Sequence, residues 1–99
     1  MDNIKLLAEA FLSVSTEEEC LELLRDICTE KELEEMTNRF TIAVMLHEHK
    51  TFVEIEKETR SSSATISRVN RSLKLGNGYR QIIEKVVRRE KEGGNAKVL

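Results

Sequence analysis

The chain has 99 residues, the length of one small domain or of one protomer in an oligomer. It contains no Pro and no Trp, and 34% of its residues are charged, a composition that favours helices over strands. No apolar run approaches the roughly 18 residues of a membrane span, and no basic N-terminal segment leads into a long apolar stretch. We therefore expect a cytoplasmic protein without a membrane partner.

The formal net charge of −2 hides a strong asymmetry along the chain. Residues 1–59 carry six basic and fifteen acidic side chains, a net charge of −9, whereas residues 60–99 carry ten basic and three acidic ones, a net charge of +7. Such a separation indicates that the C-terminal part meets a polyanion. The alternative is a chance distribution of charges on a solvated surface.

Apolar periodicity without strand-like alternation predicts an all-α fold of six helices: 3–13, 16–28, 30–48, 52–59, 63–74 and 78–91. Hydroxyl residues that precede a Glu by three positions mark three helix starts as capping boxes: Ser15 with Glu18, Thr29 with Glu32, and Thr51 with Glu54. We expect one domain over residues 1–92 and a flexible tail over 93–99. The parts of this domain are a dimerisation core (1–50), a helix-turn-helix (51–75) and a C-terminal helix (78–92).

The first and third predicted helices are too apolar for an isolated small domain. In the first, the stripe is wide and includes Ile4, Leu6, Leu7, Ala8, Ala10, Phe11 and Leu12. In the third, apolar residues nearly encircle the helix: Phe40, Ile42, Ala43, Val44, Met45 and Leu46. A helix that is apolar on most sides needs burial on most sides, so the pattern predicts a homodimer.

The two cysteines, Cys20 and Cys28, are eight positions apart, about 12 Å along one helix, which is beyond the reach of a disulfide bond. We expect small buried thiols in a reducing compartment. A zinc site with His47 and His49 is disfavoured, because their i,i+2 spacing directs the two rings to different helix faces. No metal or other cofactor is therefore expected.

Residues 51–75 have the pattern of a helix-turn-helix. Ile66, Val69 and Leu73 recur at i, i+3 and i+7 and should face the core, which leaves small hydroxyl residues and then cations on the opposite face. Hydroxyl groups bond to bases or phosphates, and cations attract the phosphate backbone. The residues expected to contact double-stranded DNA are Ser62, Ser63, Ala64, Thr65, Ser67, Arg68, Arg71, Lys74 and Arg80. An ordinary helical hairpin with a solvated polar face is the alternative.

Two features of this segment depart from a simple helix-turn-helix. The turn has Arg60 near its tightest point, and because a non-Gly residue is strained at positive φ, we expect a wider turn than usual. The first helix of the pair carries Glu54, Glu56 and Glu58, which repel phosphate.

The segments "LEEMTNRFTIAVML" (33–46) and "TISRVNRSLK" (65–74) resemble the bacterial Trp repressor family, and more closely its YerC/YecD-type relatives. The resemblance covers residues 15–90 and is strongest over 64–74. It implies a six-helix fold that forms an intertwined homodimer. It also implies a transcriptional regulator, most simply a repressor, whose two helix-turn-helix units contact successive major grooves of a palindromic operator.

The resemblance further implies a pocket for an effector, because the founding member of the family binds L-tryptophan. The matching positions here are Thr29, Arg39, Arg68 and Ser72. Where that member has Gly, this chain has Val69, whose side chain would fill the space that the indole occupies. We therefore expect no tryptophan corepressor, and the sequence identifies no other small-molecule effector.

The first helix of the pair departs from the family, since polar or basic positions that support DNA have become Phe52, Val53 and Glu56. A protein-interaction adaptor that retains the fold without binding an operator is therefore the alternative function. An enzyme is disfavoured, because "GNGYR" (76–80) lacks the strand and spacing of a phosphate-binding loop and is typical of a turn between helices.

Overall fold

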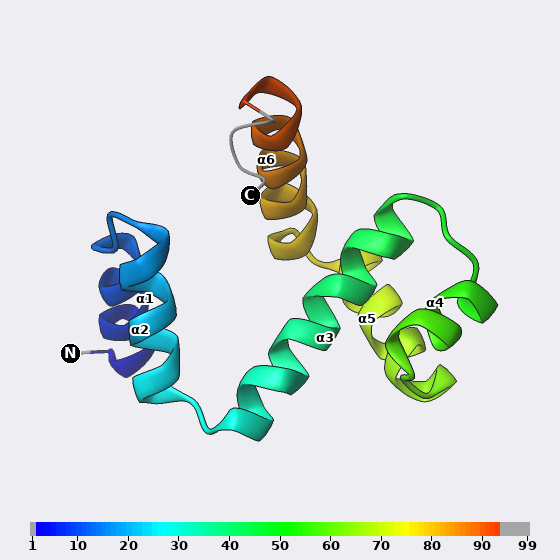
Figure 1. Ribbon diagram of the computed structural model, residues 1–99, viewed down its shortest axis with the longest axis horizontal. Helices are drawn as coiled ribbons and strands as arrows, with labels where there is room; N and C mark the ends of the chain where they lie inside the picture. Colours follow the sequence, from blue (N-terminus) through cyan, green and yellow to red (C-terminus); the bar gives the residue numbers. More distant parts are fainter. Residues whose placement is uncertain (1, 94–99) are drawn as a thin grey trace. The chain divides into compact units, whose positions relative to one another are not determined.

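The computed structural model describes residues 2–93, with side chains described up to Lys91. Within this range the chain is all-α, as predicted (Figure 1). The helices are α1 (Asn3–Leu12), α2 (Glu17–Ile27), α3 (Glu30–His47), α4 (Phe52–Thr59), α5 (Ser63–Leu75) and α6 (Gly78–Gly93). Residues 94–99 of the predicted flexible tail lie outside the described residues.

The chain divides into two compact units, Met1–Glu35 and Met36–Leu99. The first unit contains α1, α2 and the beginning of α3, and the second contains the rest of α3 together with α4, α5 and α6. The predicted helix-turn-helix therefore lies entirely within the second unit. The organisation of residues 1–92 as one domain, with a dimerisation core over 1–50, stays a prediction.

The capping box predicted from Ser15 and Glu18 is wrong by one position. α2 has Thr16 as its N-cap, with the Thr16 hydroxyl accepting from the Glu19 backbone N–H at 3.1 Å. The Glu19 carboxylate in turn accepts from the Ser15 backbone N–H at 2.7 Å. Consecutive hydroxyl and Glu residues offer the same bonds in two registers, and the later register satisfies the first N–H groups of the helix.

The other two capping boxes are confirmed. At the start of α3, the Thr29 hydroxyl accepts from the Glu32 N–H at 3.0 Å, and the Glu32 carboxylate accepts from the Thr29 N–H at 2.9 Å. At the start of α4, Thr51 and Glu54 form the same reciprocal pair at 3.1 and 2.8 Å. Both helices are thus fixed where the sequence places their first turns.

α3 ends in a hydrogen-bonded reversal at His49, which has a φ of 67°. The Lys50 N–H donates to the Met45 carbonyl at 3.0 Å, and the His49 N–H donates to the Leu46 carbonyl at 2.9 Å. This is the Schellman arrangement, in which a residue in the left-handed region satisfies the last carbonyls of a helix. It sends the chain directly into Thr51 and the start of α4.

The second unit has one apolar core, to which α3, α4, α5 and α6 all contribute. Its buried members are Ile42, Ala43, Met45, Ile55, Ile66, Val69 and Ile83. Leu73 is partly buried against this core, so the predicted inward direction of Ile66, Val69 and Leu73 is confirmed. The rings of Phe40 and Tyr79 pack at a centroid distance of 6.2 Å and join α3 to α6.

The two units differ in how far their apolar residues are buried. In α3, the residues that nearly encircle the helix are buried or half-buried within the second unit. In the first unit, large apolar side chains are exposed at Ile4, Leu6, Leu7, Leu12, Leu21 and Ile27, and the second unit also exposes Met36, Phe52, Val53, Leu75, Ile82 and Val86. What separates the units is burial: neither α1 nor α2 has a buried residue, so the described residues of the first unit have exposed apolar side chains without a buried core of their own.

Cys20 and Cys28 are half-buried rather than buried, and they form no disulfide bond with each other. Cys28 is the C-cap of α2 and has an extended backbone, so the predicted helix does not continue through it. Among the described residues, no group of three His, Cys, Asp or Glu side chains is placed to hold a metal ion. Over the same residues, no helix has the length and apolar character needed to cross a membrane.

Candidate nucleic-acid interface

The turn between α4 and α5 consists of Arg60, Ser61 and Ser62 and is tighter than predicted. Arg60 adopts the left-handed conformation with φ 58° and ψ 26°, and its N–H donates to the Glu56 carbonyl at 2.8 Å. The expectation of a wider turn is wrong, because Arg60 accepts the strained conformation instead of lengthening the loop. Such a residue costs on the order of 1–3 kcal/mol, which the surrounding packing and hydrogen bonds must offset.

Hydrogen bonds fix the turn on both sides. The Asn38 amide of α3 donates from Nδ2 to Ser61 Oγ at 2.7 Å, although the two residues are 23 positions apart. The Ser61 N–H donates to Thr59 Oγ1 at 3.3 Å, and the Thr59 hydroxyl donates to the Ile55 carbonyl at 2.7 Å. Asn38 was not a predicted site residue, because no spacing in the sequence connects it with the turn.

The N-terminus of α5 is closed by Ser62. Its hydroxyl accepts from the Thr65 N–H at 3.2 Å and donates to Thr65 Oγ1 at 3.1 Å, and its carbonyl accepts from the Ile66 N–H at 3.1 Å. Ser62 and Thr65, both predicted to contact DNA, thus bond to each other inside the helix. Their hydroxyls contribute to the start of α5 in the free protein.

The exposed face of α5 carries the remaining predicted residues of this helix. Ser63, Ala64 and Ser67 are exposed, and the hydroxyls of Ser63 and Ser67 bond to no side chain or backbone group among the described residues. Arg68, Arg71 and Lys74 are exposed as well. The helix therefore presents small side chains near its N-terminus and cations in its later turns, opposite the buried Ile66 and Val69.

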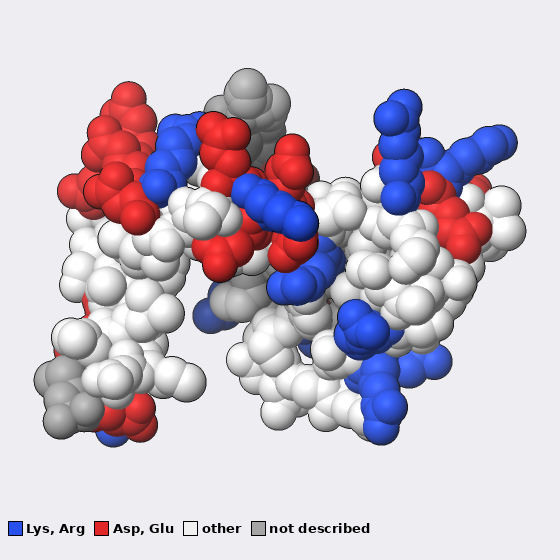
Figure 2. Space-filling model, turned by 90° about the horizontal axis from the view of Figure 1, so that it is seen from below, with Lys and Arg blue, Asp and Glu red and all other residues white. Residues whose placement is uncertain are grey.

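The charges around α5 are unevenly distributed. α5 itself contains three cations and no acidic residue, and on the face shown in Figure 2 Lys and Arg side chains project from the part that holds α4 and α5. Within α4, Glu54 and Glu58 are exposed and Glu56 is half-buried. Of the charged side chains that the first unit shows in the same view, most are acidic (Figure 2). A polyanion would therefore be attracted to α5 and repelled by the glutamates of α4.

Arg80 lies at the start of α6 and has a contact within the protein. Its Nη2 donates to the Gly76 carbonyl at 2.8 Å, and the Gly76 N–H donates to the Ser72 carbonyl at 2.9 Å. A Cβ at Gly76 would lie 3.0 Å from the Ser72 carbonyl oxygen, so a larger residue there would need a small shift of the backbone. Arg80 thus closes the turn between α5 and α6 while its remaining guanidinium donors stay exposed.

The capping carboxylate of α4 has a shifted pKa. The backbone N–H of Thr51 donates to Glu54 and, with the Thr51 hydroxyl and the charge of Lys50, holds the Glu54 pKa below its ordinary value of 4.5. Glu54 is therefore an anion at neutral pH. It lies in the first turn of α4, where the positive end of the helix dipole stabilises a negative charge.

The residues matched to the effector pocket are divided between the two units. Thr29 belongs to the first unit, where its hydroxyl caps α3, whereas Arg39, Arg68 and Ser72 belong to the second and are exposed. Val69 is 4% exposed and is part of the core. At this position the volume is already occupied by the protein's own side chain.

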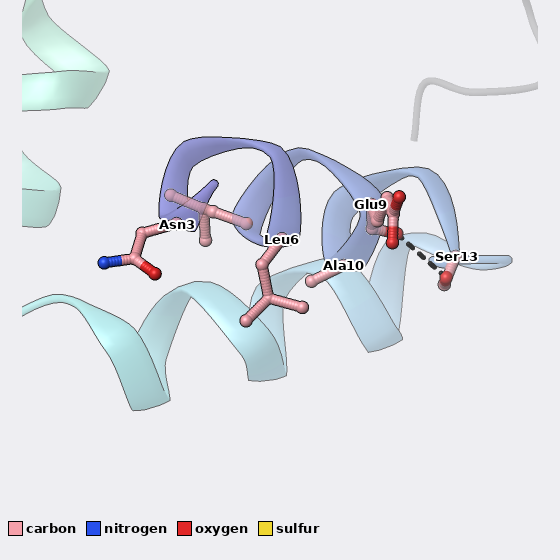
Figure 3. A pocket seen from close by; sticks show the side chains of 6 residues that line it. Asn3, Leu6, Glu9, Ala10 and Ser13 are labelled. Atoms are coloured by element: carbon pink, nitrogen blue, oxygen red, sulfur yellow. Dashed lines mark hydrogen bonds between the residues drawn. The ribbon is translucent and has the colours of Figure 1, made fainter. Parts of the chain in front are cut away.

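A hollow of about 440 Å³ lies along α1, away from the predicted site residues. It is lined by Asn3, Leu6, Leu7, Glu9, Ala10 and Ser13. α1 and α2 lie side by side, and Leu6 points from α1 toward α2 (Figures 1 and 3). Ser13 Oγ donates to the Glu9 carbonyl at 2.9 Å along one wall. Few polar groups point into the hollow, so it resembles exposed apolar surface more than a binding site for a small molecule.

Comparisons with known proteins agree with this fold. The family model described as Trp repressor protein matches residues 2–87. The uncharacterized protein YerC of Bacillus subtilis (strain 168) is 39% identical over 90 residues, which cover 90% of this chain and 86% of YerC.

Two solved structures are also similar over most of their length. A TrpR-like protein from Eubacterium eligens ATCC 27750 has a TM-score of 0.79 and 42% identity, over 84% of this chain and 87% of that one. A protein from Staphylococcus aureus, described as a candidate Trp repressor, has a TM-score of 0.79 and 37% identity, over 84% of each chain.

Proposed function

The chain belongs to the Trp repressor family, and on this premise we propose that it is a sequence-specific DNA-binding regulator. We infer that it acts in the cytoplasm as a homodimer on a palindromic operator, most simply as a repressor that occludes a promoter. The family is one of regulators and not of enzymes. The observation that carries the proposal is the division of α5 into a buried apolar side and an exposed side of hydroxyls and cations.

The exposed side of α5 suits the major groove. Ser63, Ala64 and Ser67 are small, so the helix backbone approaches base edges closely, and the two hydroxyls donate to or accept from bases. Arg68, Arg71 and Lys74 follow on the later turns and neutralise phosphates, which supplies the sequence-independent part of the affinity. At the beginning of α6, the exposed guanidinium of Arg80 has further N–H groups that can donate to phosphate.

Ser62 and Thr65 act on DNA binding through the shape of α5. Because their hydroxyls bond to each other in the free protein, they hold the first turn in place. The N–H groups and positive dipole end of that turn then face phosphate.

A homodimer explains the exposed apolar surface of the first unit. Ile4 and Leu12 are 76% and 84% exposed, and the burial of such side chains favours association. A two-fold dimer places two copies of α5 on two half-sites, which is why a palindromic operator is proposed.

The proposed regulator works without tryptophan. The founding member of the family keeps Gly where this chain has Val69, and Val69 is packed with Ile66 in the core. A ligand ring at this position would have to displace a buried side chain, which costs on the order of 1–3 kcal/mol in a well-packed core.

Selection of bound duplexes from a random pool tests the proposed function, with and without added amino acids. We expect a palindromic consensus that is independent of tryptophan, and sedimentation of the free protein as a dimer. Recovery of no sequence above background at low salt would contradict sequence-specific binding.

The second candidate function is a protein-interaction adaptor that retains the fold without an operator. It is favoured by the exposed Glu54 and Glu58 of α4 and by the acidic first unit. The salt dependence of duplex binding separates the two functions. A regulator loses affinity steeply as salt rises, whereas an adaptor binds little duplex at any salt concentration.

A further inference from the structure

The hydrogen bond between Asn38 of α3 and Ser61 connects the turn before α5 with a helix that is distant in the sequence. We propose that Asn38 is a positioning residue, which fixes the N-terminus of α5 through Ser61. The inference rests on the proposed function, because its consequence is measured in DNA binding. It assigns a role to a residue of α3 that is not among the residues predicted to contact DNA.

The bond itself is short and shielded. The distance between Asn38 Nδ2 and Ser61 Oγ is 2.7 Å, and both residues are half-buried. Water therefore competes less effectively for the two groups than it does on an open surface. A directional bond in such a place restricts how the turn sits against α3, which the non-directional apolar contacts of the core do not do.

Ser61 is also bonded along the turn. Its N–H donates to the Thr59 hydroxyl, which in turn donates to the carbonyl of the fully buried Ile55. The turn is thus held to α3 by the Asn38 side chain. It is held to the end of α4 by two successive hydrogen bonds through the Thr59 hydroxyl. Since Arg60 next to it is in the strained left-handed region, these bonds help to keep the turn closed.

The consequence for α5 follows from the covalent chain. Ser61 directly precedes Ser62, whose hydroxyl and carbonyl hold the N–H groups of Thr65 and Ile66. A displacement of Ser61 therefore moves the cap, and with it the exposed Ser63 in the first turn. Base contacts need side chains held to within about 0.5 Å of the productive geometry, so a small displacement matters for sequence discrimination.

Four full-length variants test the inference: Asn38→Leu, Ser61→Ala, the double variant, and Thr37→Ala as a control on the exposed neighbouring position of α3. The probes are the palindromic duplex selected from the random pool and a scrambled duplex of equal length. We expect each single change at 38 or 61 to weaken binding to the selected duplex by about fivefold, the factor that corresponds to one typical hydrogen bond. The double variant should be no weaker than the singles, because both remove the same bond.

The scrambled duplex separates positioning from general damage. Its affinity and the salt dependence of binding should not change, because the cations of α5 are untouched. Thermal unfolding sets a temperature at which all variants are folded. Equal losses on both duplexes, full additivity in the double variant, or an unchanged affinity for the selected duplex would each overturn the inference.

Amide hydrogen exchange provides a measurement that needs no DNA. In Asn38→Leu the N–H groups of Thr65 and Ile66 should exchange faster than in the wild type, whereas Thr37→Ala should leave them unchanged. If the wild type binds no duplex, the proposed function fails while the exchange rates still decide whether Asn38 positions α5. If the wild type binds DNA and the exchange rates are equal, the positioning role fails alone.

Discussion

Ser62 and Thr65 bond to each other through their hydroxyls at the first turn of α5, at an oxygen–oxygen distance of 3.1 Å. The Ser62 hydroxyl also accepts from the Thr65 N–H. Ser63, which lies between them in the sequence, is exposed and forms no such bond within the described part of the chain. We therefore expect these adjacent serines to have separate functions, Ser62 in the stability of the helix and Ser63 in contact with DNA.

This difference predicts that substitution of Ser62 lowers the stability of the protein, whereas substitution of Ser63 lowers its affinity for DNA. Ser62→Ala should lower the free energy of unfolding by about 1 kcal/mol, because it removes an N-cap. Ser63→Ala should change it by less than about 0.5 kcal/mol, as exposed substitutions usually do. It should nevertheless weaken binding to the selected duplex by about fivefold. Urea unfolding and fluorescence anisotropy measure the two quantities, and equal destabilisation by both changes would contradict the separation.

The sequence was sufficient to predict the helices and the inward face of α5. Ile66 and Val69 are buried as their spacing requires, because a helical repeat fixes which side chains share a face. The N-cap residue of α2 was harder to predict, because Ser15 and Thr16 are consecutive hydroxyl residues. Either one satisfies the first N–H groups, so the pattern alone does not select between them.

Two parts of the candidate interface could not be predicted from the sequence. Arg60 takes a conformation that its residue type disfavours, and only its hydrogen bonds and the packing of its neighbours explain this. Asn38 meets Ser61 across 23 positions, a distance at which periodicity carries no information. Spacing also cannot separate a hydroxyl that caps a helix, such as that of Ser62, from one that forms no hydrogen bond among the described residues, such as that of Ser63.

Two measurements on Val69 test that its side chain is part of the core and that the wild type binds no tryptophan. Val69→Ala should lower the free energy of unfolding by about 2–3 kcal/mol through the lost packing. Val69→Gly should lower it by about 1 kcal/mol more, because Gly is unfavourable inside a helix. Isothermal titration calorimetry of the wild type with millimolar tryptophan should give no binding heat. Micromolar tryptophan binding by the wild type would contradict the expectation of a regulator without this corepressor.

The salt dependence of duplex binding should report on the cations of α5. Arg71→Ala removes one exposed cation from each protomer, so the slope of log affinity against log salt should become less steep by about 2 for a dimer. The effect should be similar for the selected and scrambled duplexes, because phosphate contacts carry no sequence information. Lys31→Ala removes an exposed cation from the first unit and serves as the matched control with an unchanged slope. Equal slopes for Arg71→Ala and the wild type would remove this residue from the interface.

Glu54 should make the stability of the protein depend on pH in the acid range. Its pKa in the folded chain is held below 4.5, chiefly by the Thr51 backbone N–H, so folding favours the carboxylate. The stabilisation is therefore fully present above pH 4.5 and is lost as the pH falls through the lowered pKa. The difference in unfolding free energy between the wild type and Glu54→Gln should be constant near neutral pH and should shrink below pH 4.5. Urea unfolding from about pH 7 to about pH 3 measures this difference, and a value that stays constant throughout would show that the capping charge contributes nothing.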